Sequence, residues 1–347
     1  MTRTLDAAWR GGTNHFHLIR LIAAWLVIYS HAWAITGAPG TDHLGQLTGH
    51  TAGGFAVDVF FTISGFLIAA SYERNRWQDF LLARALRIFP ALIVCVALAT
   101  CVLGPWLSIS PDYWRDAKTW HYAWGGVTLI DLQFWLPGVF DALPRTAVNG
   151  SLWTLPIEVR LYLALFFAGL IGMLHRWRYL AGWALAIGAA CAFAWKRAPL
   201  PEYAENLIWV TAFFITGTLC WVWRERIRLS LRVLLALIAA CAFARGSIAF
   251  IPCYFATVAY GTFVLAFLPG RPWIRHNDLS YGIYLYGWPM QQLALMAGAT
   301  TILSNIVAGT ALALCCAALS WFAIERPALA WHRRRANVGA GERAARA

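Results

Sequence analysis

Charged residues are scarce in this sequence. Only 13% of the 347 residues are Asp, Glu, Lys or Arg, whereas 60% are hydrophobic. Several apolar runs reach the roughly 20 residues that a helix needs to cross a hydrocarbon core. The composition is that of a polytopic membrane protein with an all-α fold. The first run has no clear small-residue cleavage site, so we expect a retained helix rather than a removed signal peptide.

Patterns that hold metals or disulfides are also missing. The eight cysteines fall in or beside apolar runs without C-x-x-C spacing, and we interpret them as small packing residues. The nine histidines show no H-E-x-x-H or similar pattern, so no metal site is predicted. Internal repeats, which mark many transporters built from two matching halves, are not visible either.

Polar, Pro and Gly clusters cut the chain into about ten predicted spans. The run 232–244 is short and meets the next at "RGS", which favours a tight helical hairpin. Glu325 and Arg326 stand before Pro327, and we expect them to close the last span in a structural role. The predicted spans are 17–36, 54–71, 88–107, 152–174, 179–195, 206–223, 232–244, 248–268, 279–297 and 302–324.

The positive charges predict an orientation. If every predicted span crosses the membrane, the segments between spans alternate between its two sides. Most of the 28 Lys and Arg residues fall in the segments on the same side as the N-terminus. Because Lys and Arg accumulate in short cytoplasmic loops, both termini are expected in the cytoplasm. The expected parts are a cytoplasmic segment 1–16, a membrane domain 17–327 and a basic cytoplasmic tail 328–347. Topology and attraction to anionic lipid explain the net charge of +12, which needs no nucleic acid partner.

Two ionisable residues lie within the first predicted span. In "RLIAAWLVIYSH", eleven positions separate Arg20 from His31, so both side chains share one helix face, roughly 16 Å apart. A lone Arg near a helix end often extends its charge to the membrane surface. A charge at membrane depth costs several kcal/mol, and its pairing with His31 on one face favours a functional role.

Six motifs in a fixed order resemble the acyltransferase type 3 family. They are R-x10-H at Arg20 and His31, "GGFAVDVFFTISGFLI" at 53–68, "RALRIFPAL" at 84–92, "SLWTLPIEVRLY" at 151–162, "LSYGIYLYGWPMQ" at 279–291 and "SWFAIERPAL" at 320–329. Its members are integral membrane enzymes that O-acylate, mostly O-acetylate, sugars of bacterial surface polysaccharides and related molecules. The family often carries a histidine where this chain has Gly287 or Trp288, so we place no catalytic role there.

The resemblance implies a bacterial inner-membrane enzyme with acetyl-CoA as co-substrate and no bound cofactor. His31 has an unperturbed pKa near neutrality, so it can take a proton from a sugar hydroxyl. Asp58 lies within reach if the first two spans pack as a hairpin, and its carboxylate would fix the imidazole tautomer. The alternative for Asp58 is a structural ion pair with Arg20 or Arg160.

Glu158 is the third catalytic candidate, because a carboxylate inside a span needs a partner. Arg160 stands two positions further along and therefore on another helix face. Arg20 or a hydroxyl such as that of Tyr162 is the expected neighbour.

The donor is a polyanion that needs phosphate-binding cations. Arg84 and Arg87 are three apart, on one helix face at the predicted cytoplasmic mouth of the third span. Arg20 is a third candidate, either beside the pyrophosphate or against the thioester carbonyl. Ser64 precedes Gly65, which permits either close helix packing or a local break that exposes oxyanion donors.

Aromatic residues gather in the long predicted outer segment 108–151. Their faces can bind the apolar faces of sugar rings, and an interfacial aromatic belt is the alternative. The candidate acceptor-binding residues are Trp120, Trp124 and Trp153.

The residues together predict a membrane O-acyltransferase that transfers acetyl from acetyl-CoA to a hydroxyl of a surface carbohydrate or glycolipid. One alternative is a transporter of a glycolipid or acyl group, since a polar path between helices serves transport as well. Another is a signalling or scaffold protein that keeps the fold without the chemistry.

Overall fold

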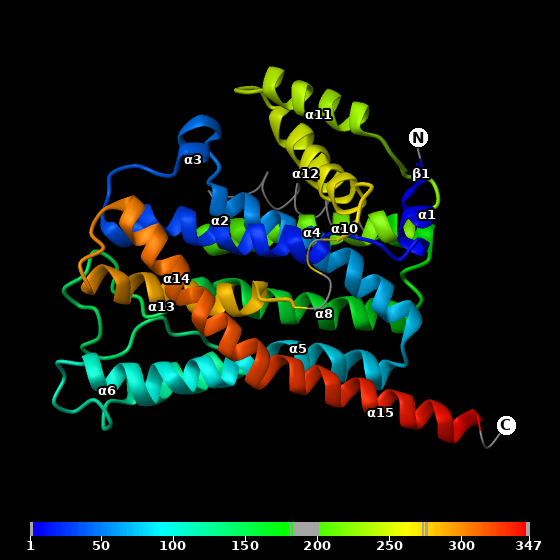
Figure 1. Cartoon of the computed structure of the whole chain (residues 1–347). Coiled ribbons are helices and arrows are strands. Elements are labelled where there is room, and N and C mark those ends of the chain that lie inside the picture. The colour runs from blue at the N-terminus through cyan, green and yellow to red at the C-terminus, as the bar shows by residue number, and fades with distance from the viewer. Residues whose placement is uncertain (1–2, 181, 183–200, 273, 275–276, 345–347) are drawn as a thin grey trace. The chain divides into compact units, whose positions relative to one another are not determined.

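A computed structural model describes residues 3–180, 182, 201–272, 274 and 277–344, and their regular structure is almost entirely α-helical (Figure 1). This confirms the all-α prediction. The exception is a pair of two-residue strands, β1 (Arg3–Thr4) and β2 (Arg228–Leu229), joined antiparallel. The helices are α1 (Leu5–Arg10), α2 (Phe16–Thr36), α3 (His43–Thr48), α4 (Ala52–Arg74), α5 (Trp77–Leu98), η1 (Ala99–Leu103), α6 (Gly104–Leu107), α7 (Ala117–Thr128), η2 (Gly150–Thr154), α8 (Leu155–Leu170), α10 (Glu202–Val222), α11 (Leu231–Phe243), α12 (Phe250–Ala266), α13 (Ser280–Met296), α14 (Ile302–Ser320), η3 (Trp321–Glu325) and α15 (Arg326–Ala344).

Within the described residues, six helical runs are long and apolar enough to cross a membrane. They are Phe16–Thr36, Ala52–Arg74, Trp77–Leu107, Gly150–Leu170, Glu202–Val222 and Ile302–Arg335. Helices α11 and α12 are apolar but shorter. The predicted span 179–195 lies almost wholly outside the described residues. The number of ten spans and the cytoplasmic position of both termini therefore stay predictions.

Two helical runs pass the boundaries expected from the sequence. Helix α5 begins at Trp77, well before the predicted start at residue 88. At the other end of the chain, the helix does not end at Glu325 and Arg326 but continues through Pro327 as α15; the end of the membrane span at these two residues stays a prediction. The proline sits in the first turn of α15, directly after the π-helical turn η3. The wider π-helical turn relieves the steric clash between the Pro327 ring and the backbone carbonyl four residues earlier. In a regular α-helix this clash would bend or break the helix.

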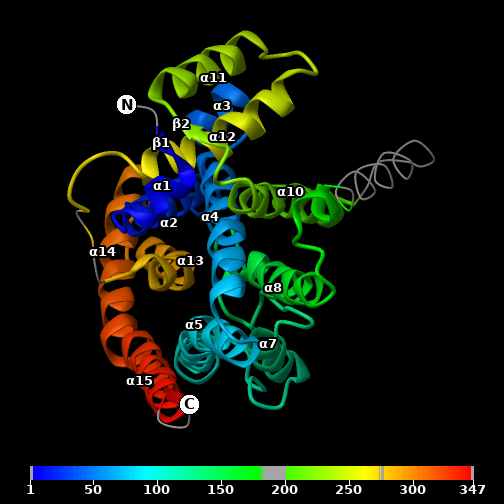
Figure 2. The same ribbon diagram turned by 90° about the vertical axis from the view of Figure 1, so that its right-hand side faces the viewer.

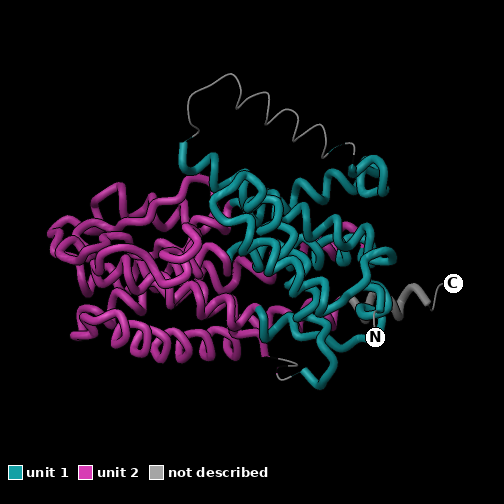
Figure 3. The backbone as a smooth tube through the Cα atoms, turned by 90° about the horizontal axis from the view of Figure 1, so that it is seen from above, with its two compact units in different colours: residues 1–19, 57–75, 157–273 teal, residues 20–56, 76–156, 274–347 magenta. Residues whose placement is uncertain are grey.

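The chain folds into two compact units, shown in Figure 3. Unit 1 comprises Met1–Ile19, Val57–Asn75 and Ile157–Trp273. Unit 2 comprises Arg20–Ala56, Arg76–Pro156 and Ile274–Ala347. Three of the five divisions fall within helices α2, α4 and α8, which contribute residues to both units.

Unit 1 contains a close approach of α4 to α10. A Cβ atom on Gly65 would lie 1.8 Å from the carbonyl oxygen of Phe214, and one on Gly217 would lie 2.0 Å from that of Thr62. The hydroxyl of Thr218 donates to the carbonyl of Gly65 at 3.2 Å. Gly65 thus serves close helix packing within an unbroken α4, the first of the two alternatives that the sequence left open.

Unit 2 is built around α13, most of whose side chains are buried. This helix lies between α14 and α5 (Figure 2). The amide of Gln291 donates to the side-chain oxygen of Asn305 at 3.0 Å, and the amide of Asn305 donates back to the carbonyl of Gln291 at 3.0 Å. Asn149 donates to the carbonyl of Leu285 at 2.8 Å. These hydrogen bonds pair buried amide N–H groups that would be costly to bury without a partner.

Three segments predicted to lie outside the membrane meet at one end of unit 2, on the left in Figure 1. Gly37 follows α2 and lies close to Pro144: a Cβ atom added to Gly37 would be 3.1 Å from the Pro144 side chain. The amide of Gln292 near the end of α13 donates to the carbonyls of Arg145 and Ala147. Segments 37–53, 108–151 and 298–301 therefore occupy the same end of the unit, as the predicted alternation of spans requires.

Candidate active site

Unit 2 contains a buried group of charges, which we call the arginine–carboxylate cluster: Arg20, Arg87, Asp278 and Glu325. Arg20 Nη1 donates to Asp278 Oδ2 at 2.9 Å, and Arg87 Nη2 donates to the same oxygen at 2.7 Å. Arg87 Nη1 lies 3.5 Å from Glu325 Oε2. The side chains of Asp278 and Glu325 are only 5% and 3% exposed. The formal positive charges of the two guanidinium groups equal the negative charges of the two carboxylates. Buried charges are normally paired in this way.

The cluster brings together two of the predicted donor-binding arginines, Arg20 and Arg87. Arg84 lies one turn before Arg87 on α5 and is partly buried. The sequence did not single out Asp278, whose other oxygen accepts from the backbone N–H of Ser280 at 3.2 Å. Its signal was an acidic residue directly before an apolar span, a position that ordinary helix capping also explains. Phosphate binding by these arginines stays a prediction.

His31 lies in α2 against the indole of Trp288 from α13. The ring centroids are 4.8 Å apart and the planes meet at 74°, an edge-to-face contact. Trp288 is itself anchored, because its Nε1 donates to the carbonyl of Ala147 at 2.8 Å. The Nδ1 atom of His31 is buried and has no hydrogen-bond partner among the described residues. The imidazole is thus held in place while one ring nitrogen stays available to another group.

Asp58 is buried in unit 1 and accepts hydrogen bonds on both oxygens. Trp209 Nε1 donates to Oδ1 at 2.9 Å, and the hydroxyl of Tyr254 donates to Oδ2 at 2.7 Å. These partners come from α10 and α12 and were not anticipated from the sequence. His31 belongs to unit 2, and its pairing with Asp58 stays a prediction.

Glu158 and Ser64, predicted to serve catalysis and donor binding respectively, lie together in unit 1. The hydroxyl of Tyr162 donates to Glu158 Oε1, as the expectation of a hydroxyl neighbour required. The hydroxyl of Ser64 lies 3.3 Å from the same oxygen. Arg160 points elsewhere and donates to the hydroxyl of Tyr203 at 3.0 Å, consistent with its position on another helix face. One carboxylate therefore links α4 and α8.

The predicted acceptor-binding tryptophans lie in unit 2. Trp120 and Trp124 are exposed and one turn apart on α7, so they share a face of that helix. Trp120 Nε1 donates to the carbonyl of Trp114 at 3.0 Å. Trp153 is partly buried in η2. Helix α7 was not predicted; its signal was Asp116, whose side chain accepts from the backbone N–H of Lys118 as an N-cap.

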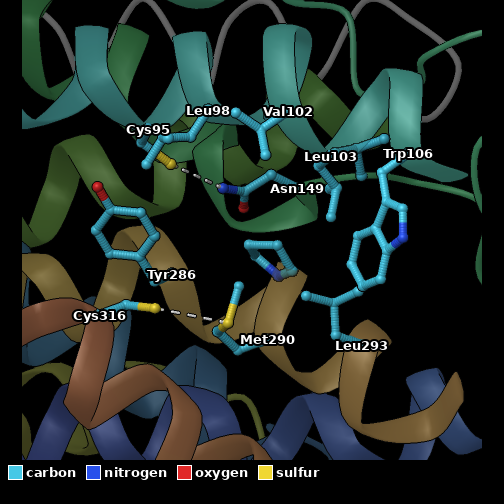
Figure 4. A pocket seen from close by; sticks show the side chains of 13 residues that line it. Cys95, Leu98, Val102, Leu103, Trp106, Asn149, Tyr286, Met290, Leu293 and Cys316 are labelled. Atoms are coloured by element: carbon cyan, nitrogen blue, oxygen red, sulfur yellow. Dashed lines mark hydrogen bonds between the residues drawn. The ribbon is translucent and has the colours of Figure 1, made fainter. Parts of the chain in front are cut away.

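An apolar cavity of about 250 Å³ lies in unit 2 beside α13 (Figure 4). Residues of α5, η1, α13 and α14 line it, and Asn149 brings an amide to its wall. That amide donates to Cys95 Sγ at 3.9 Å as well as to the carbonyl of Leu285. The labelled side chains in Figure 4 are Cys95, Leu98, Val102, Leu103, Trp106, Asn149, Tyr286, Met290, Leu293 and Cys316. Such a lining suits a hydrocarbon group rather than a charged one.

Among the residues that the structure describes, no group of three or more His, Cys, Asp or Glu side chains could hold a metal ion.

A family comparison decides the class of protein. The model of the acyltransferase domain family matches residues 14–325 of the chain. The chain belongs to the acyltransferase type 3 family. This confirms the resemblance that the six sequence motifs indicated. As a family member with apolar helices long enough to cross a membrane, the protein is a membrane-embedded O-acyltransferase.

Three curated relatives extend the comparison. The acyltransferase is 28% identical to the O-acetyl transferase of Shigella phage Sf6, over 90% of this chain and 95% of that protein. It is 29% identical to Nodulation protein 10 of Rhizobium leguminosarum bv. viciae, over 92% and 94% of the two chains. It is 26% identical to the exopolysaccharide production protein ExoZ of Rhizobium meliloti (strain 1021), over 50% and 56%. No solved structure matches this acyltransferase.

Proposed function

We propose that this acyltransferase transfers an acetyl group from acetyl-CoA to a hydroxyl of a surface carbohydrate or glycolipid at the bacterial inner membrane. The observation that carries the proposal is the placement of His31, whose buried Nδ1 is available beside the anchored ring of Trp288. The names of two relatives, an O-acetyl transferase and an exopolysaccharide production protein, support the acetyl group and the carbohydrate acceptor.

His31 acts as the general base. Its imidazole accepts the proton of the acceptor hydroxyl while the hydroxyl oxygen attacks the thioester carbonyl of the donor. The carbon–sulfur bond of the resulting tetrahedral intermediate then breaks, and the departing sulfur takes the proton from His31. The products are the sugar ester and the free thiol, and the imidazole returns neutral.

Arg84 and Arg87 bind the phosphates of the donor. Asp278 and Glu325 hold the Arg87 guanidinium at two of its nitrogens, which fixes the direction of its donors. Arg20 shares Asp278 and stands on the face of α2 that carries His31, eleven residues away. One helix therefore carries both a residue for the phosphates of the donor and the base that acts at its thioester.

Asp58 and Glu158 are further catalytic residues in this proposal, and Ser64 is a further donor-binding residue. Trp120, Trp124 and Trp153 contact the acceptor. These roles carry over from the family resemblance and the chemistry of each side chain.

The proposal is tested by mass spectrometry of surface polysaccharide and glycolipid from three matched strains, which carry the parent protein, no protein, or His31→Ala. We expect one base-labile acetyl ester with the parent and its loss in the other two strains. An identical ester pattern in all three strains overturns the proposal. Loss of the ester on deletion, with full retention in His31→Ala, overturns the catalytic role of His31 and favours a transporter.

A further inference from the structure

A second cavity, of about 470 Å³, lies in the outer segment of unit 2, apart from His31 and the arginine–carboxylate cluster. We call it the outer-segment cavity. Its volume falls within the roughly 300–1,000 Å³ of small-ligand sites. It is lined by Ile109, Ser110, Asp116, Lys118, Trp135, Leu136, Pro137, Gly138, Asp141 and Thr146.

Hydrogen bonds to two backbone carbonyls hold together the two segments at the base of this cavity. Ile109 N–H donates to the carbonyl of Gly138 at 3.1 Å, and the hydroxyl of Ser108 donates to the carbonyl of Pro137 at 2.6 Å. Gly138 has a φ of 70°, and a Cβ atom there would lie 2.7 Å from the backbone nitrogen of Ser110. The chain therefore needs glycine at this point to bring the two segments together. A site with a fixed floor loses little entropy when a ligand binds.

The walls combine an aromatic face with fixed polar groups. Trp135 is 51% exposed, and its Nε1 donates to the hydroxyl of Thr146 at 3.0 Å, which holds the ring edge. Asp116 Oδ1 accepts from the backbone N–H of Lys118 at 2.9 Å, which orients the carboxylate. The side chain of Asp141 is exposed at the cavity wall.

We propose that the outer-segment cavity binds one neutral sugar unit of the acceptor saccharide. The Trp135 face packs against the C–H face of the sugar ring, and the carboxylates of Asp116 and Asp141 accept hydrogen bonds from its hydroxyls. Two carboxylates against the single ammonium of Lys118 disfavour an acidic sugar. This inference rests on the proposed function, because it concerns recognition of the acceptor.

The cavity is connected to His31 through contacts in unit 2. Thr146 lines the cavity, and the next residue, Ala147, accepts a hydrogen bond from Trp288, whose ring contacts His31. A chain of contacts therefore runs from the cavity wall through Thr146, Ala147 and Trp288 to His31. The sugar unit in the cavity is then a neighbour of the unit that is acylated, and the cavity acts in acceptor binding rather than in chemistry.

The test measures acetyl transfer by the purified full-length protein in lipid nanodiscs. Acetyl-CoA is the donor, and surface polysaccharide from the same cells, saponified to remove its esters, is the acceptor. Trp135→Ala is expected to raise the acceptor KM about tenfold, with kcat and the donor KM unchanged. Trp135→Phe keeps a ring face and should stay within about threefold of the parent, and Asp141→Asn should raise the acceptor KM without affecting folding.

Trp331→Ala is the matched control, because Trp331 is 50% exposed on α15 and lies outside the cavity. It should keep the acceptor KM of the parent. An unchanged acceptor KM in both Trp135→Ala and Asp141→Asn, or a loss confined to kcat, overturns the inference while the proposed function stands. No transfer by the parent protein overturns both.

Discussion

Arg20 and Arg87 donate to the same carboxylate oxygen, Oδ2 of Asp278, at 2.9 and 2.7 Å. The two arginines come from α2 and α5, and Asp278 lies two residues before α13 begins. A single anion thus joins three elements of unit 2. Removing one member of such a buried group leaves the other charges uncompensated, which costs more than the pairing itself contributes.

Asp278→Asn should therefore destabilise the protein strongly, by about 3–5 kcal/mol as for other broken buried ion pairs. The matched control is Asp112→Asn, which removes an exposed pair with Arg115, and its effect should stay below about 1 kcal/mol. Thermal unfolding of the two purified variants in one detergent gives the comparison. Equal unfolding midpoints for Asp278→Asn, the control and the parent would show that the cluster is dispensable for stability.

Arg84→Ala tests donor binding at the arginine one turn before Arg87 on α5. Loss of charge-assisted hydrogen bonds to phosphate, worth about 1.5–3 kcal/mol, should weaken acetyl-CoA binding about ten- to a hundredfold. Lysine at the same position should restore part of the affinity, because it keeps the charge but loses the planar fork. Calorimetric titration of acetyl-CoA measures both effects.

Arg115→Ala serves as the control for that titration, since Arg115 is exposed in the outer segment. It should bind acetyl-CoA as the parent does. Parent-like affinity in Arg84→Ala would remove Arg84 from the donor site, and a matching loss in Arg115→Ala would point to a general effect of charge.

The sequence predicted those contacts that follow from position within one helix. Tyr162 is one turn after Glu158, and its hydroxyl, one of the two neighbours expected for that carboxylate, donates to it. Arg20 and His31 were likewise assigned to one face of one helix from their spacing alone. Such arguments need only the helical repeat, which a long apolar run establishes before any tertiary structure is known.

Contacts between distant elements could not be predicted in this way. Asp278 receives Arg20 and Arg87 only because α2, α5 and α13 pack together, and its local sequence resembles an ordinary helix cap. Helix α15 continues through Pro327 directly after a π-helical turn, and no residue pattern in the sequence predicted that turn. Tertiary packing decides both features.

Gly65→Ala tests the close packing of α4 against α10. The added Cβ would lie 1.8 Å from the carbonyl oxygen of Phe214, a backbone atom that cannot move away alone. Overpacking of this kind costs about 1–3 kcal/mol or more, so the variant should unfold at a lower temperature. Gly11→Ala is the control, because Gly11 has a φ of −64° and its nearest such contact is 3.3 Å away. Parent-like stability in Gly65→Ala would contradict the packing role.

The most direct test of the central claim is transfer of radiolabelled acetyl from acetyl-CoA to saponified surface polysaccharide by the purified protein, compared between the parent, His31→Ala and His121→Ala. His121 lies in the outer segment beside Asp131 and serves as the control. We predict base-labile label on the polysaccharide with the parent and His121→Ala, and none with His31→Ala, although all three proteins insert equally into the membrane. Transfer by His31→Ala at the rate of the parent would contradict the account.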